Sequence, residues 1–532
     1  MTSFVQMLRT TAAAAALAAG LLPFTGSAEN APKTLRFIPQ ADLRSVDPIW
    51  TTAYVTRNFG YLVFDTLFSL DKDFKPQPQM VDRWTASDDK LTYRFILRDG
   101  LKWHDGQPVR AADCVASLER WGKRDTLGQK LMEAVGEIQA VDDKTFTITL
   151  KSPFPLILDA LGKLSSNVPF MMPERLAKTD AYQQIPEAVG SGPFKFVKEE
   201  WVPGNKAVFV KNTDYVPREE LPSFASGGKV AKVDRVEWLY IPDTTTAAAA
   251  RNAGEADWYE QPPADLVPIF AANKDIVVAT VDPLGNHGTL RFNHIQPPFT
   301  NLKLREAVLN LVDQKDYMAA AAGNPKYWKT CAALFGCGTP FETNAGADAL
   351  LKGPNPAKAK QLIQEAGYKG EKIVLMSATD QPIVHGQALV TLEALRSAGL
   401  NVEFQANDWG TLITRRTSKE PIDKGGWSIF HTWFSAPDFY SPAVNILVRG
   451  SGEKAWFGWP TDPKIEELID AWFKAPDLAA QKKLAADIQV EAYTNEIAYV
   501  PTGQFIVPTA YRKNVDGIII APVAFLWNVE KK

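Results

Sequence analysis

The chain has 532 residues, with 58 Lys and Arg against 61 Asp and Glu, so its formal net charge at pH 7 is −3. That small negative charge argues against nucleic acid or an anionic membrane surface as a partner. After the first 28 residues no apolar run reaches the roughly 18 residues needed to cross a bilayer, so we expect a soluble mature protein of roughly three compact units.

Residues 1–28 have the features of a secretory signal peptide. Arg9 precedes a short apolar run from Ala12 to Leu22, and small residues follow it. The run is too short to span a bilayer, so we expect cleavage between Ala28 and Glu29. The alternative is that this segment is retained as an N-terminal anchor.

Periodicity and turn residues predict strands, hairpins and helices in the first half of the chain. In chain order we expect a strand at 34–39, a helix within 54–70, a strand at 91–97, a short strand between turns at 99–100 and 104–108, a helix ending near 121, a hairpin of 137–141 with 146–150, a second hairpin turning at 203–205, a strand at 236–242, a helix at 244–254, a strand at 289–293 and a helix at 304–312.

The second half carries the clearest evidence for the fold class. Asn355 caps a helix whose first residue is Pro356. A strand at 373–376, a helix at 383–398 and a strand at 402–405 then follow, a succession that implies a right-handed parallel crossover in an α/β sheet. Further on we expect a helix after Asp462-Pro463, a helix at 477–493 and extended segments at 499–500 and 505–507, before the chain returns to its first half.

Three cysteines are present. In an oxidising compartment Cys331 and Cys337 can close a disulfide, and the alternative is two reduced thiols. Cys114 shares a helical stripe with Leu118 and Trp121, so we expect a buried thiol.

Signatures of catalysis and metal binding are absent from the sequence. The five histidines are scattered singly, and there is no Cys-x-x-Cys, His-Glu-x-x-His or Gly-x-Ser-x-Gly motif. Asp42 with Asp47, and Asp71 with Asp73, could be called paired carboxylates, but we interpret them as solvated loop residues. We therefore expect no catalytic residue, no metal site and no cofactor.

Several phrases resemble one known family. Residues 88–120, DDKLTYRFILRDGLKWHDGQPVRAADCVASLER, are similar to the signature of the family-5 extracellular solute-binding proteins, the dipeptide- and oligopeptide-type receptors of ABC importers. GSGPFKF at 190–196 and IPDTTTAAAARNAGEAD at 241–257 also resemble family phrases. The resemblance extends along essentially the whole mature chain.

The resemblance implies an α/β, two-lobed periplasmic binding protein fold of type II, with an extra subdomain in the first lobe and a hinge of two crossing strands. The expected boundaries are 29–285 plus 506–532 for lobe I, about 60–185 for its subdomain, and 286–505 for lobe II. The implied protein is a periplasmic monomer that captures a peptide or peptide-like solute and delivers it to the permease subunits of an ABC transporter. The alternatives are a receptor for a nickel chelate, an opine or an oligosaccharide, or a secreted hydrolase.

Aromatic and polar residues gather in the expected loops of the second lobe, a composition typical of clefts that hold small molecules. Peptide-binding family members carry an aspartate there that pairs with the ligand's ammonium; here that position is Ala436, and Asp438, two residues on, could substitute only if the loop shifts. The candidate ligand-binding residues are Trp409, Trp433, Phe434, Ser435, Asp438, Tyr440 and Asn445.

Overall fold

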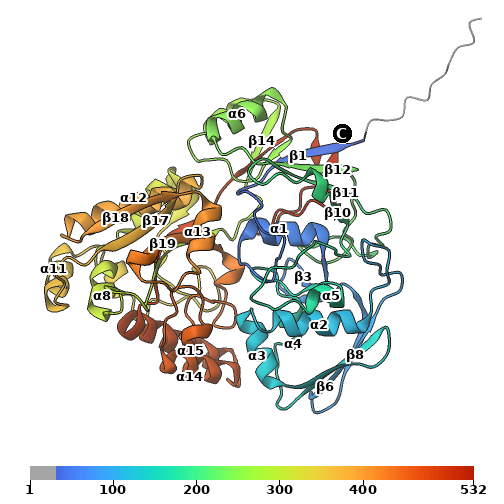
Figure 1. Ribbon diagram of the computed structural model, residues 1–532, viewed down its shortest axis with the longest axis horizontal. Coiled ribbons are helices and arrows are strands. Elements are labelled where there is room, and N and C mark those ends of the chain that lie inside the picture. Colours follow the sequence, from blue (N-terminus) through green and yellow to red (C-terminus); the bar gives the residue numbers. More distant parts are fainter. Residues whose placement is uncertain (1–31) are drawn as a thin grey trace, which may run out of the picture. The chain divides into compact units, whose positions relative to one another are not determined.

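The computed structural model describes residues 32–532, so the expected signal peptide and its cleavage site at Ala28 and Glu29 lie outside the described residues. The first of its two main sheets has the strand order β10-β11-β12-β1-β13-β21-β14 (Figure 1). Its strands are β10 (Phe194–Phe196), β11 (Lys206–Lys211), β12 (Arg235–Leu239), β1 (Thr34–Ile38), β13 (Trp258–Tyr259), β21 (Thr509–Arg512) and β14 (Ile276–Ala279). Because β21 comes from the last residues of the chain, the C-terminal segment returns to the sheet that β1 begins.

The second sheet has six strands in the order β16-β20-β15-β19-β17-β18. They are β16 (Trp328–Lys329), β20 (Tyr499–Phe505), β15 (Asn286–Phe292), β19 (Ile429–Ser435), β17 (Ile373–Ala378) and β18 (Val402–Asn407). β17 pairs in parallel with β18, and the helix between them confirms the predicted crossover. Every residue of β15, β17, β19 and β20 is buried, as expected for strands covered on both faces.

We call the part built on the seven-stranded sheet lobe I and the part built on the six-stranded sheet lobe II. Two segments cross between them, 280–285 from β14 to β15 and 506–508 from β20 to β21. The crossings lie side by side, since Asn286 pairs with Phe505, and a Cβ on Gly285 (φ +72°) would lie 2.7 Å from the Phe505 carbonyl oxygen. Glycine therefore permits this close approach, and the predicted hinge of two crossing strands is confirmed.

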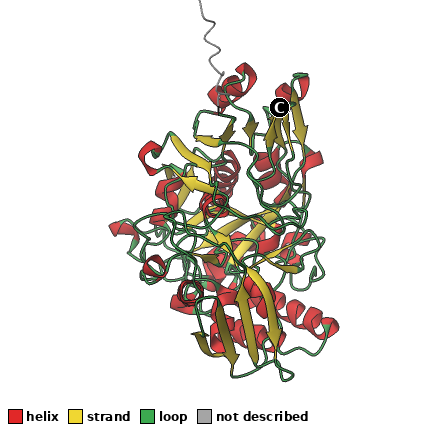
Figure 2. Cartoon of the chain, turned by 90° about the vertical axis from the view of Figure 1, so that its right-hand side faces the viewer, coloured by secondary structure: helices red, strands yellow, loops and turns green. Residues whose placement is uncertain are grey.

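A four-stranded sheet, β5-β6-β8-β7, lies near the bottom of Figure 2. Its strands are β5 (Val81–Ala86), β6 (Thr92–Leu97), β8 (Thr145–Leu150) and β7 (Val135–Ala140). β6 and the β7–β8 hairpin confirm two sequence predictions. We count this sheet and the helices at 111–134 with lobe I, because the buried Arg120 pairs with Asp47 in the loop after β1.

The helices and the remaining short strand pairs complete the chain. The helices are α1 (Tyr54–Val63), α2 (Ala111–Trp121), α3 (Thr126–Ala134), α4 (Ile157–Leu161), α5 (Glu174–Ala177), α6 (Thr244–Ala253), α7 (Val267–Ala272), α8 (Leu302–Leu309), α9 (Gln314–Ala322), α10 (Asp348–Leu351), α11 (Pro356–Glu365), α12 (Pro382–Ser397), α13 (Trp409–Arg415), α14 (Pro463–Phe473) and α15 (Leu478–Glu491). The short pairs are β2 (Asp65–Thr66) with β9 (Phe170–Met171), β3 (Phe68–Leu70) with β4 (Pro76–Pro78), and β22 (Val515–Asp516) with β23 (Glu530–Lys531). None of the helices in residues 32–532 is long and apolar enough to cross a membrane.

Local signals set several helix ends as predicted. The Asn355 side chain accepts a hydrogen bond from the Lys358 amide at 3.0 Å, and Pro356 begins α11. In α2 the predicted stripe of Cys114, Leu118 and Trp121 is fully buried. Burial raises the pKa of the Cys114 thiol, and this cysteine is free.

Some expected elements differ from the structure. Between the two turns after β6 there is a single bridge, Lys102 to Pro108, in place of a strand. α8 ends at Leu309, so the helix is shorter than predicted. The predicted segment 499–500 extends to Phe505 as the strand β20, which pairs with β15, whereas 506 and 507 lie in the crossing to lobe I. The disulfide expected between Cys331 and Cys337 is confirmed, and it lies in the loop after β16.

Four of the five histidines are buried as neutral side chains, and burial lowers the pKa of each below its ordinary value. The lowered values are about 4 for His104, about 3 for His287, about 4 for His294 and about 3 for His431. The unfolded chain binds protons at these groups below pH 6.5 while the folded chain does not, so stability falls as the pH drops from 6.5.

Glu260 and Asp282 act in the opposite direction, because burial raises their pKa to about 7 and about 6. Over the pH range from 7 to 5 the four histidines destabilise the folded chain more than these two carboxyls stabilise it, so we expect the free energy of unfolding to be lower at pH 5 than at pH 7. Urea unfolding at both pH values and equal ionic strength measures this difference. An unchanged or higher value at pH 5 would contradict it.

Candidate functional site

A cavity of about 310 Å³ opens between the two lobes. Lobe I contributes the loop at 50–52, the segment that joins α2 to α3, Asn167 and Tyr182. Lobe II contributes residues at and beyond the end of α13 and the loop at 453–459. We call this space the interlobe cavity. Its volume lies at the lower end of the range typical of small-molecule sites.

The lining of the interlobe cavity is cationic and aromatic. Five cations face one carboxylate, that of Glu453, and none of the five cations has an ion pair within residues 32–532. The cations are Lys123, Arg124, Arg416, Lys419 and Lys454. The rings are Trp50, Tyr182, Trp456, Phe457 and Trp459.

Arg416 follows the last residue of α13 and is only 2% exposed. Its guanidinium carbon lies 4.7 Å from the ring centroid of Phe457 and 5.1 Å from that of Trp456. In the described part of the chain its one side-chain hydrogen bond goes to the Thr52 hydroxyl of lobe I at 3.4 Å, and its Nε is buried without a partner. Burial lowers the pKa of Arg416 to about 9, because the charged form is poorly solvated there.

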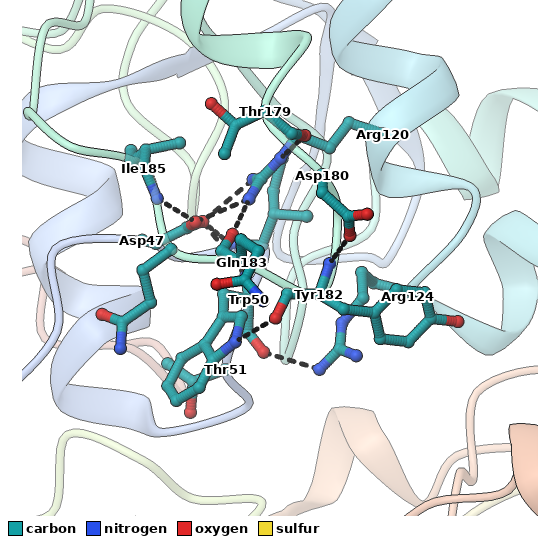
Figure 3. A network of polar contacts seen from close by, with 12 residues as sticks. Asp47, Trp50, Thr51, Arg120, Arg124, Thr179, Asp180, Tyr182, Gln183 and Ile185 are labelled. Atoms are coloured by element: carbon teal, nitrogen blue, oxygen red, sulfur yellow. Dashed lines mark hydrogen bonds and ion pairs between the residues drawn. The ribbon is translucent and has the colours of Figure 1, made fainter.

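The lobe I wall is held by a buried ion pair, shown in Figure 3. Arg120 on α2 donates to both carboxylate oxygens of Asp47, at 3.0 and 2.7 Å. Asp47 also accepts hydrogen bonds from the Ile185 amide at 2.9 Å and the Trp50 amide at 3.1 Å. The pair therefore ties the loop that carries Trp50 to the segment that carries Tyr182.

The interpretation of Asp47 as a solvated loop residue was wrong. Its carboxylate is fully buried, whereas the side chain of Asp73 is exposed. The closeness of Asp42 and Asp47 in the sequence does not indicate the environment of Asp47. The partner of Asp47 is Arg120, which lies 73 residues away on another element.

Arg124 is the second guanidinium at the interlobe cavity. It donates to the Trp50 carbonyl at 2.7 Å, and its guanidinium carbon lies 4.8 Å from the centroid of the Tyr182 ring. Its Nε is buried and has no hydrogen-bond partner among residues 32–532, and burial lowers the pKa of Arg124. Arg124 in lobe I and Arg416 in lobe II thus line one space from its two sides.

Asp438 is buried at a second contact between the lobes. Its Oδ2 accepts hydrogen bonds from the Tyr54 hydroxyl at 2.5 Å and the Ser165 hydroxyl at 2.8 Å, and its Oδ1 accepts one from Ser166 at 2.9 Å. The Ser435 hydroxyl of its own lobe donates to Oδ2 at 3.1 Å. We call these five residues the Asp438 cluster.

The backbone beside the Asp438 cluster adopts an unusual conformation. Ser166 and Asn167 have φ values of +24° and +43°, in a region that residues with a Cβ rarely adopt. Such strain persists where the surrounding contacts impose it. Here the Asn167 side chain donates to the carbonyls of Ile49 and Thr51, which fixes this turn against the loop at the interlobe cavity.

The other candidate residues occupy different places. Trp433 and Phe434 lie on β19 and not in a loop as expected, because this segment pairs with β15. Trp433 is 8% exposed and packs 5.1 Å from the Tyr54 ring of lobe I, and Tyr440 stacks 5.6 Å from Phe74 of lobe I. A smaller cavity next to the interlobe cavity is lined by Trp409, Trp433, Phe434 and Arg416.

Asn445 lies inside lobe II and does not line the interlobe cavity. Its side-chain amide donates to the Leu334 carbonyl at 2.7 Å and to the Tyr499 hydroxyl at 3.2 Å. The sequence analysis missed Arg416, Arg124 and Tyr54. The Arg415-Arg416 doublet is visible in the sequence, but only the fold shows that Arg416 has no carboxylate partner within residues 32–532.

Known proteins resemble this chain over nearly its whole length. Residues 75–455 match the family described as bacterial extracellular solute-binding proteins, family 5. A probable peptide ABC transporter periplasmic-binding protein of Sinorhizobium fredii is 41% identical over 523 residues, which cover 98% of this chain and 97% of that protein.

Two solved structures share the fold. The periplasmic binding protein AgaA of A. tumefaciens R10, in complex with agropinic acid, has a TM-score of 0.79 and 21% identity, covering 94% of this chain and 99% of that chain. A dipeptide binding protein of Pseudoalteromonas sp. SM9913, in complex with Met-Leu, has a TM-score of 0.76 and 20% identity, covering 94% of this chain and 100% of that chain. The chain therefore belongs to the bacterial extracellular solute-binding proteins of family 5.

Proposed function

We propose that this protein is the periplasmic solute-binding component of an ABC importer and that it captures a peptide or peptide-like solute between its lobes. The observation that carries the proposal is the interlobe cavity, which both lobes line at the contact that a hinge of two crossings would open and close. The 41% identical relative is a probable peptide ABC transporter periplasmic-binding protein, which supports the peptide class and the transporter partner.

The mechanism is closure around the solute. In the open form the solute meets one lobe, and contacts with the second lobe become available only as the lobes approach. A solute that binds the closed form more tightly shifts the equilibrium towards it, and the closed form then docks on the permease subunits. We propose 29–285 plus 506–532 as lobe I, with 60–185 as its subdomain, and 286–505 as lobe II.

The proposed ligand contacts include Trp409, Trp433 and Phe434 at the smaller cavity. Trp433 also packs between the lobes, so we expect Trp433→Ala to reduce both affinity and stability, and Trp433→Phe is the better test of contact with the solute. The proposed mature protein is a monomer released by cleavage after Ala28. Mass spectrometry of the secreted protein locates the cleavage site, and light scattering of the purified protein measures its oligomeric state.

Calorimetry with a panel of di- and tripeptides tests the function. We expect micromolar binding, equivalent to about −8 kcal/mol at standard state, and a smaller radius of gyration by X-ray scattering when the solute is present. Binding of only sugars or nickel chelates would refute the peptide class. Scattering profiles that never change with any solute would refute closure.

Incubating the protein with a peptide that it binds distinguishes a receptor from a hydrolase. We propose that the protein has no catalytic activity, so the peptide should be recovered intact by mass spectrometry after long incubation. Among residues 32–532 no group of His, Cys, Asp and Glu side chains is arranged to hold a metal ion. A cleaved peptide in the presence of the protein, and not in its absence, would overturn this part of the proposal.

A further inference from the structure

We propose that the solute of the interlobe cavity is an acid with at least two anionic groups, one bound by Arg416 of lobe II and the other by Arg124 of lobe I. This inference deepens the proposed function, on which it rests, by naming the chemical class that the same cavity selects. It follows from the placement of unpaired cations on both walls.

Arg416 provides the first step of the argument. A buried charge is costly unless an opposite charge and hydrogen bonds compensate for it. The rings of Trp456 and Phe457 cover the guanidinium but do not use its N–H donors, which lie in its plane. With Nε unpartnered and one weak hydrogen bond to Thr52, this side chain lacks the acceptor that a carboxylate would supply in bidentate geometry.

Each lobe contributes one arginine that can bind an anionic group of the solute. Within the described residues the buried Nε of Arg124 also has no partner, and the acceptor that Arg124 does have is a neutral carbonyl, that of Trp50. A solute whose two anionic groups reach Arg416 and Arg124 makes its full set of contacts only when the lobes are closed. Binding energy is thereby coupled to closure, as the receptor mechanism requires.

The remaining lining favours the same class of solute. Lys123, Lys419 and Lys454 are exposed at the interlobe cavity and raise its positive potential, which attracts anions from solution. The protein as a whole is slightly acidic, so this local excess of cations is specific to the site. The indole rings of Trp50 and Trp459 offer flat apolar surfaces for the uncharged part of the solute.

Few carboxylates at the site are available to bind an ammonium group of a solute. Both carboxylate oxygens of Asp438 already accept hydrogen bonds, from Tyr54, Ser165, Ser166 and Ser435. Glu453 is the one carboxylate of the lining, and it is exposed. A net positive solute would therefore meet uncompensated repulsion, whereas a net negative one would not.

Three dipeptides of similar size test the inference: Ala-Glu, its near-isosteric amide Ala-Gln, and Ala-Lys. Binding is followed by tryptophan fluorescence, because Trp50, Trp456 and Trp459 line the cavity, and by calorimetry. Succinate and citrate extend the panel to acids that are not peptides. We expect Ala-Glu to bind at least tenfold more tightly than Ala-Gln, and Ala-Lys to bind most weakly.

The decisive variant is Arg416→Met, which keeps much of the packing volume and removes the charge. We expect at least a tenfold loss of affinity for Ala-Glu and a smaller preference over Ala-Gln, with an equal or higher melting temperature for the unliganded variant. A residue that only supports the fold would lower the melting temperature instead. Arg415→Met is the matched control, since Arg415 is on the same helix, is partly exposed and donates to the Gly425 carbonyl.

The outcomes separate this inference from the function on which it rests. Equal binding of Ala-Glu, Ala-Gln and Ala-Lys, or an unchanged Ala-Glu affinity in Arg416→Met, would overturn the acid class and leave the receptor for peptides standing. Binding of succinate or citrate without any dipeptide would support the acid class and overturn the peptide class. If no member of the panel bound, both would be rejected. If Arg416→Met does not fold, the ratio of the Ala-Glu and Ala-Gln affinities in the native protein still tests the acid class, because equal affinities would overturn it.

Discussion

Replacing Asp438 with asparagine is expected to weaken solute binding by at least tenfold and to leave a larger fraction of the protein open. Three of the four hydroxyls that donate to this carboxylate, those of Tyr54, Ser165 and Ser166, belong to lobe I, so the proposed opening of the lobes would break these hydrogen bonds. Hydrogen bonds to a charged acceptor contribute about 1.5–3 kcal/mol each, and a neutral amide cannot accept all of them. Loss of about 1.4 kcal/mol of closure energy corresponds to a tenfold change.

Calorimetry and X-ray scattering of the Asp438→Asn variant, with and without solute, measure both effects. Asp470→Asn is the matched control, because Asp470 of lobe II also pairs across the lobes, 2.6 Å from Lys130, but its side chain is 49% exposed. Exposed ion pairs contribute little, so we expect less than a twofold change in affinity there. Equal effects in the two variants would remove any special role for the Asp438 cluster.

Asp47→Ala and Arg120→Met are each expected to lower the free energy of unfolding by about 3–5 kcal/mol, since each leaves an uncompensated charge in the protein interior. Both side chains are almost completely buried (Figure 3), and Asp47 also accepts three backbone hydrogen bonds beyond those from Arg120. Denaturant unfolding measures the change. Because the pair holds the loop of Trp50, we also expect weaker solute binding in any variant that remains folded.

A double variant, Asp47→Leu with Arg120→Met, distinguishes charge burial from loss of packing. We expect it to be more stable than the sum of the two single losses predicts, because no isolated charge remains. Asp73→Ala is the matched control: Asp73 pairs with Lys72 at 3.1 Å with both side chains exposed, and its removal should change stability by less than about 0.5 kcal/mol. Additive losses in the double variant would contradict this account.

Local sequence patterns predicted most of the regular structure. The β17–α12–β18 unit, the cap at Asn355 and the β7–β8 hairpin depend on residues near one another in the chain, whose periodicity and turn chemistry restrict the backbone directly. The family phrases add the two-lobed arrangement and the hinge. The prediction was wrong at β19, where a segment that reads as an aromatic loop forms a buried central strand through pairing with β15.

The sequence by itself determined most of the elements, the family and the solute-binding class, because each of these is encoded in local patterns. Tertiary structure alone decided which polar side chains are available to a solute. Asp438 is occupied by Tyr54, 384 residues away, and Asp47 by Arg120, while the charged Arg416 has no carboxylate partner in the described part of the chain. The free energy of a buried charge depends on every group around it, and those groups come from distant segments that no local pattern brings together.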